Sequence, residues 1–118
     1  MKELILDKKF RGIHSNSFTG RKEGEQARAE LQLDSKDCDN EVYKIVIPDS
    51  TTSFNASFFL GLLFQSIEKC GSISSFEKKY VFSYDCLEKD LRPFIEKNIQ
   101  ESLRKAENEL NGSTGIDL

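Results

Sequence analysis

The side chains of this sequence that are best suited to chemistry are few and scattered. His14 is the only histidine, and no second histidine or cysteine lies close to it to complete a metal site or a catalytic triad. Cys70 closes an apolar stretch, where a thiol behaves most simply as a small apolar side chain. Asp85 and Glu88 are neighbouring carboxylates, but their position after a predicted strand is typical of a turn. We therefore expect no catalytic residue and no metal ligand among them.

The short motifs that mark common enzyme and nucleotide-binding sites are also absent. The sequence contains no GxGxxG, no Walker loop, no GxSxG and no HExxH. We expect a protein that is not an enzyme and that needs no cofactor. Catalysis stays an alternative only if a partner supplies the catalytic groups.

Length and composition favour one globular domain. A chain of 118 residues with 37% hydrophobic and 31% charged residues is long enough to bury a core without disulfides or metals. We expect residues 1–110 to form this domain. Residues 111–118 are rich in Gly, Ser and Thr, which predicts a flexible C-terminal tail.

The charge and the cysteines bear on partners and location. A net charge of −3 gives no general reason to bind nucleic acid or an anionic membrane. The three cysteines are an odd number without CxxC spacing, so one disulfide is compatible with the sequence but a disulfide framework is not implied. We expect a cytoplasmic protein, because the start of the chain does not resemble a signal peptide and the longest apolar run is too short to span a bilayer.

A strand, a loop and a helix at the centre of the chain must position any site. Val42 to Ile47 is β-branched and aromatic, which predicts a buried strand. Pro48 and Asp49 end it. Phe54 to Lys69 is apolar at most positions and predicts a helix, with Thr52 or Ser53 as its cap and Gly71 as its left-handed end.

The flanking segments predict an α/β arrangement around this unit. A short edge strand at Leu4 to Leu6 and a second strand at Ile13 to Thr19 precede a helix from Gly20 to about Leu33, capped by Thr19. Asp34 to Glu41 predicts an irregular acidic loop. After the central helix, Lys79 to Tyr84 predicts a strand parallel to the central one, and a last amphipathic helix is expected to begin near Arg92.

The central helix is more apolar than contact with one sheet requires. Its apolar side chains cover most of the helix circumference, whereas packing on a sheet needs a stripe about 100° wide. Placing Phe59 and Ile67 on the sheet leaves Phe58 and Leu60 toward the outside. We expect these two side chains to contact a protein partner. Two alternatives are that neighbouring helices cover them, or that a second copy of the chain does so in a homodimer.

The start of the same helix has a second property. Unpaired N–H groups and the helix dipole favour an anion at this point, such as a phosphate on Ser53 or Ser57 or an acidic group of a partner. Arg21 and Arg28 are cations available to assist. A small-ligand or nucleotide-phosphate-binding domain is therefore the alternative function.

Three stretches carry a resemblance to a known family. The run IVIPDSTTSFNASFFLGLLFQSI resembles the core of the STAS-like domains, which are small bacterial relatives of the anti-sigma-factor-antagonist fold. GRKEGEQAR is similar to the segment that opens their first helix, and FEKKYVFSYD with the following helix resembles their next strand and last helix. The resemblance covers most of Thr19 to Lys105. It implies a mixed sheet of about four strands with helices packed against it, and a role in binding proteins.

The resemblance also implies where regulation acts. In anti-sigma-factor antagonists the loop-to-helix junction reads Asp-Ser-Ser-Gly, and its first serine is phosphorylated by a partner kinase. Here the junction falls on Asn55, Ala56, Ser57 and Phe58, so the phosphoacceptor position has no hydroxyl. Ser57 is then the neighbouring candidate phosphoacceptor.

The sequence hypothesis is therefore a non-catalytic regulatory module. It binds a protein partner through the loop and the N-terminal half of the central helix, and the partner that the resemblance suggests is a histidine-kinase-like ATPase in a regulatory or defence operon. The residues predicted to make this contact are Ser53, Asn55, Ser57, Phe58 and Leu60.

Overall fold

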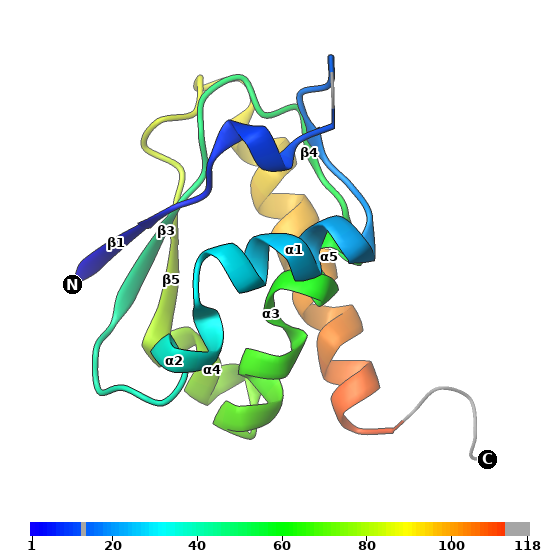
Figure 1. Cartoon of the computed structure of the whole chain (residues 1–118). Coiled ribbons are helices and arrows are strands. Elements are labelled where there is room, and N and C mark those ends of the chain that lie inside the picture. Colours follow the sequence, from blue (N-terminus) through cyan, green and yellow to red (C-terminus); the bar gives the residue numbers. More distant parts are fainter. Residues whose placement is uncertain (13, 113–118) are drawn as a thin grey trace.

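Two small parallel sheets and five α-helices make up the part of the chain that the computed structural model describes, residues 1–12 and 14–112 (Figure 1). The predicted tail at 111–118 falls mainly on residues outside this part. The elements in chain order are β1 (Lys2–Ile5), the 3₁₀ turn η1 (Lys8–Phe10), β2 (Ser17–Phe18), α1 (Arg21–Glu30), α2 (Leu33–Lys36), β3 (Tyr43–Val46), β4 (Ser53–Phe54), α3 (Ala56–Cys70), α4 (Ile73–Lys79), β5 (Tyr80–Ser83) and α5 (Arg92–Leu110).

The larger sheet has the strand order β1-β3-β5, with every pair parallel. The predicted central strand is its middle strand, and the predicted parallel pairing with the strand after the helix is confirmed. Leu4, Ile45 and Phe82 lie side by side in one row of the register. Their face of the sheet is the one against the helices, since the Phe82 ring stacks on Phe59 of α3 at 6.1 Å between centroids.

The smaller sheet corrects the predicted topology. β2 and β4 are two residues each and pair in parallel, Ser17 with Ser53 and Phe18 with Phe54. The predicted single mixed sheet of about four strands is therefore wrong: the described residues form two sheets with parallel pairs. The polar stretch after β3 separates them, because it leaves the first sheet and its Thr52 N–H donates to the carbonyl of Asn16 at 2.8 Å.

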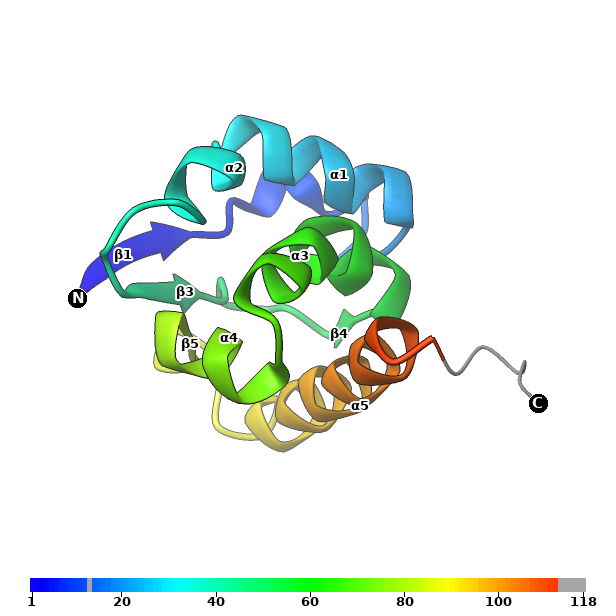
Figure 2. The same cartoon turned by 90° about the horizontal axis from the view of Figure 1, so that it is seen from below.

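The helices lie on one side of the larger sheet. In Figure 1 the sheet is at the left and α1, α3 and α5 are to its right; the view from below in Figure 2 places α3 between α1 and α5. The apolar stripe predicted for the last helix is buried, with Ile95 and Ile99 at its start. The central helix is therefore surrounded on several sides at once.

The backbones of α1 and α3 are in direct contact, which lets α1 pack closely against one side of α3. A Cβ added to Gly61 would lie 2.1 Å from the carbonyl oxygen of Arg21, and one added to Gly24 would lie 2.2 Å from the carbonyl oxygen of Phe58. Two helices come this close only where both lack side chains at the crossing. The glycines thus set the distance between α1 and α3.

This packing contradicts the prediction that Phe58 and Leu60 face outward. Phe58 has no exposed surface and Leu60 is 8% exposed. The Phe58 ring lies 5.1 Å from Phe18 and 5.4 Å from Phe54 between centroids, so the short second sheet covers it. The alternative, that neighbouring helices cover these side chains, is therefore closer to the structure, but strands β2 and β4 are what cover Phe58. Phe58 is a core residue.

The ends of α3 agree only in part with the sequence. Gly71 ends the helix in the left-handed region with φ 89°, as predicted. The cap is Asn55, whose side chain accepts from the Ser57 N–H, rather than Thr52 or Ser53. Thr19 likewise does not cap α1, because the capping position is Gly20 with φ 95°. The predicted irregular loop after α1 contains the short helix α2.

Candidate functional site

A pocket at the start of α3 brings together most of the residues that the sequence predicted for partner contact. Its volume is about 450 Å³, and β4, α1 and α5 form the other walls. We call it the α3 pocket and define it by its lining side chains: Arg21, Ser53, Phe54, Asn55, Ala56, Ser57, Leu60, Asn98, Glu101, Ser102 and Lys105. Of the predicted contact residues only Phe58 is outside it.

The first turn of α3 supplies polar groups to the pocket. The Asn55 Oδ1 accepts from both the N–H and the hydroxyl of Ser57, at 2.8 Å and 2.5 Å. Ser57 is half-buried and lines the pocket, so its hydroxyl is on the side where a partner or ligand can reach it. The positive end of the α3 dipole lies at the same place, which favours a negative group there.

Helix α5 forms one wall of the pocket and is hydrogen-bonded to β4. The side-chain oxygen of Asn98 accepts from the Phe54 N–H at 2.8 Å. The buried Ser102 hydroxyl in turn donates to the Asn98 carbonyl at 2.8 Å. Because these bonds connect α5 to the residues just before α3, the shape of the pocket is fixed by the fold rather than by loop conformation.

The charges at the rim favour an anionic partner group. Arg21 from the first turn of α1 and Lys105 from α5 line the pocket, against one acid, Glu101. Arg21 also makes an exposed 3.6 Å ion pair with Glu109. Exposed pairs of this kind contribute little, so the guanidinium can exchange partners at small cost. Among the side chains that line the pocket, the cations therefore exceed the acids by one, and Glu109 outside the lining pairs with Arg21.

Arg28 does not belong to this site, which corrects its predicted anion-binding role. The side chain is 5% exposed and donates to the Leu62 carbonyl at 3.0 Å and to the Ser66 hydroxyl at 2.9 Å. Its remaining donors bind Asp34 and the buried Asp37. The guanidinium is thus fully used inside the protein, where it lowers the pKa of Asp34 through a hydrogen bond and its charge.

The acidic residues after α1 serve this internal network. The buried carboxylate of Asp37 accepts from the Tyr80 hydroxyl at 2.5 Å and from the Ser66 hydroxyl at 2.6 Å. Burial and the bond to Asp37 raise the pKa of Tyr80. Asp39 accepts from the Tyr43 hydroxyl and pairs with Lys79 at 2.9 Å. The segment connects α1 and α3 to the sheet and is structural.

The other candidates from the sequence are apart from the α3 pocket. Glu88 holds the turn after β3, since its carboxylate accepts from the N–H and the hydroxyl of Ser50, and the N–H bond lowers its pKa. His14 is exposed on the connection before β2. The three cysteines are free thiols, and burial raises the pKa of Cys70. Residues 1–12 and 14–112 contain no cluster of three or more metal-binding side chains.

The pocket residues that the sequence did not predict as site residues include four on α5: Asn98, Glu101, Ser102 and Lys105. Lys105 and Asn98 are seven positions apart and so share one face of α5, but periodicity alone does not say that this face turns toward α3. Only the tertiary packing brings them there.

Throughout the described part of the chain, no helix combines the length and apolarity needed to cross a membrane.

Comparison of the chain with models of protein families, with curated proteins and with solved structures gave no match.

Proposed function

We propose that this chain is a cytoplasmic, non-catalytic regulatory module, related to the STAS-like domains, that binds a protein partner through the α3 pocket. The partner that the resemblance suggests is a histidine-kinase-like ATPase of a regulatory or defence operon. The observation that carries the proposal is the convergence of Ser53, Asn55, Ser57, Leu60 and Arg21 in one pocket. The three free cysteines agree with a reducing compartment.

The chemistry of the pocket suggests which part of the partner enters it. The positive end of α3, Arg21 and Lys105 all favour a carboxylate. Within the chain itself, the Ser57 N–H and hydroxyl donate to the Asn55 Oδ1. With Phe58 buried in the core, a large apolar anchor is not available at this point. An acidic segment of the partner is therefore the proposed contact.

Phosphorylation of Ser57 would act on the same contact. A phosphate there would be at the helix start, where its charge is stabilised, and would occupy the position proposed for the partner carboxylate. We therefore expect Ser57→Asp to weaken partner capture while Ser57→Ala retains it.

The test is affinity capture from an extract of the native cells with matched charge variants. The pocket variant carries Arg21→Glu and Lys105→Glu. The control carries Lys22→Glu and Lys97→Glu, which make the same charge change on the same two helices at exposed positions outside the pocket. The wild-type chain and the control are expected to retain one stoichiometric protein, and the pocket variant is expected to lose about 90% of it. Equal capture by all three chains would overturn the proposal.

A phosphate-bearing small ligand is the second candidate function. It is favoured by the volume of about 450 Å³, which suits a small molecule, together with the two cations at the rim. Calorimetric titration with ATP, ADP and inorganic phosphate separates the two functions. Heat that saturates at micromolar nucleotide and disappears in the pocket variant would favour the ligand-binding function.

A further inference from the structure

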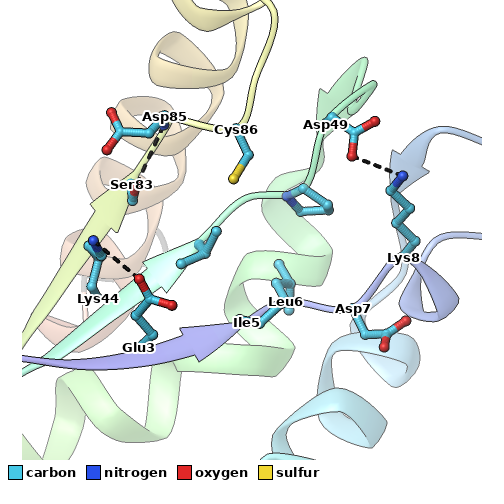
Figure 3. Close-up of a pocket in the computed structure, with 12 residues that line it drawn as sticks. Glu3, Ile5, Leu6, Asp7, Lys8, Lys44, Asp49, Ser83, Asp85 and Cys86 are labelled. Atoms are coloured by element: carbon cyan, nitrogen blue, oxygen red, sulfur yellow. Dashed lines mark hydrogen bonds and ion pairs between the residues drawn. The ribbon is translucent and has the colours of Figure 1, made fainter.

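No helix of the described residues lies on the face of the larger sheet that points away from α1, α3 and α5, although Val46 and Ser83 on that face are only 9% exposed. Strand alternation and the register place six side chains on it in two rows, which we call the open sheet face: Glu3, Lys44 and Val81, then Ile5, Val46 and Ser83. A cavity of about 520 Å³ lies over five of them at the carboxyl ends of the strands (Figure 3). The open sheet face shares no residue with the α3 pocket.

The exposed apolar side chains of the protein are concentrated on this face. Within the described residues five large apolar side chains are exposed, and two of them, Ile5 at 61% and Val81 at 38%, are on the open sheet face. Met1 and Val42 continue its alternation just before β1 and β3. The fifth, Phe94, is on α5. Scattered apolar residues are ordinary on a surface, but a contiguous group is a mark of an interface.

The architecture indicates the shape of the missing cover. Parallel sheets occur almost only with both faces covered, and helices are what cover them. Three strands about 4.8 Å apart place the two outer strands about 10 Å from each other. One α-helix is about 10 Å across. A single helix laid along the open sheet face would therefore cover it.

The charges around the face indicate the composition of that helix. Lys8 is paired with Asp49 at 2.9 Å and Lys44 with Glu3 at 3.5 Å. Asp7 and Asp85 also line the cavity, and neither has an ion-pair partner among the described residues, although the Asp7 carboxylate accepts from the Lys9 N–H at 2.8 Å (Figure 3). The cavity therefore keeps two unneutralised carboxylates at its rim. A two-fold dimer with its strands parallel would bring these same carboxylates against each other, so the charge disfavours that arrangement and favours a basic partner.

We propose that the open sheet face docks an amphipathic helix of a protein partner, with an apolar stripe against the exposed Ile5 and Val81 and with Lys or Arg side chains toward Asp7 and Asp85. The apolar stripe would supply the affinity through burial, and the basic side chains would fix the orientation of the helix. This surface is separate from the α3 pocket proposed for the acidic segment, and the two proposals are independent of each other.

Amide-resolved NMR titration of the full chain tests the proposal with two synthetic peptides. One is an amphipathic helix of about 18 residues, or five turns, built from leucine and lysine; the other has glutamate in place of lysine. The lysine peptide is expected to shift the amides of Ile5, Val46 and Val81 in a saturable manner. The glutamate peptide is expected to bind at least about tenfold more weakly.

Two matched variants separate this surface from general adhesion to an acidic protein. Val81→Lys changes an exposed residue of the face and is expected to weaken binding of the lysine peptide about tenfold or more. Phe94→Lys makes the same chemical change on α5 and is expected to leave binding unchanged. The proposal is overturned if both peptides bind equally or neither binds, if the shifts fall elsewhere, or if light scattering shows a homodimer that Val81→Lys dissociates.

Discussion

Replacing Gly61 by alanine tests the close approach of α1 and α3. The added methyl carbon would lie 2.1 Å from the Arg21 carbonyl oxygen and 3.0 Å from the Glu25 nitrogen, so both contacts are with backbone and no side chain can turn aside. Alanine favours a helix over glycine by about 1 kcal/mol, whereas overpacking costs about 1–3 kcal/mol and occasionally more. Because the clash is with rigid backbone, we expect an overpacking cost at the upper end of this range. We expect a net loss of about 2 kcal/mol.

Urea unfolding followed by circular dichroism measures this loss. The control is Gly12→Ala, because a methyl carbon there would meet only the Ser15 Cβ at an ordinary 3.5 Å, and we expect a change within about 0.5 kcal/mol. Gly24→Ala, on the other side of the same crossing, is expected to resemble Gly61→Ala. If Gly61→Ala is as stable as the wild-type protein or more so, the two helices are not in backbone contact and the account of their packing is wrong.

Three further predictions concern the internal polar contacts. Arg28→Met leaves the buried Asp37 with only the longer 3.7 Å ion pair to Lys69 and is expected to lower the free energy of unfolding by about 3 kcal/mol in urea titrations. Asn55→Ala removes the α3 cap and should lower it by about 1 kcal/mol in the same assay. The Tyr43 hydroxyl, with Lys79 and the Glu41 N–H, lowers the pKa of Asp39 to about 2, so these contacts stabilise the fold above about pH 4 and are lost as the pH falls toward 2. Tyr43→Phe should therefore flatten the acid limb of a stability profile, and an unchanged limb would refute this assignment.

The parts of the fold that the sequence predicts well are those with a local physical cause. The β-branched run around Ile45 forms the central strand, and Gly71 ends α3 because only a residue tolerant of a positive φ fits there. Pro93 in the first turn of α5 similarly marks the start of that helix. Each of these signals operates within a few residues along the chain.

The errors come from contacts between distant segments. The apolar pattern of α3 shows which side chains avoid water, but it does not show how many neighbours surround the helix, so Phe58 was expected outside. The acidic residues after α1 looked irregular, since nothing local indicates that Asp37 meets Arg28, Ser66 and Tyr80. Both outcomes depend on packing that periodicity does not encode.

The candidate site was predictable to the extent that it is contiguous. Ser53, Asn55 and Ser57 share a pocket because they are consecutive around one helix start. The cation Lys105 comes from the C-terminal helix α5, and no local pattern in the sequence indicates that it lies at the pocket. Arg21 and Arg28 were both predicted as anion-binding cations, and only Arg21 lies at the pocket.

The central claim, that the α3 pocket binds an acidic segment of a protein partner, is tested most directly by NMR titration of the isotope-labelled chain with the purified captured protein. The account predicts saturable shifts at the amides of Asn55, Ser57 and Leu60, and loss of those shifts when Arg21 and Lys105 are both changed to glutamate. Binding of undiminished affinity by that variant, or shifts confined to other surfaces, would contradict the claim.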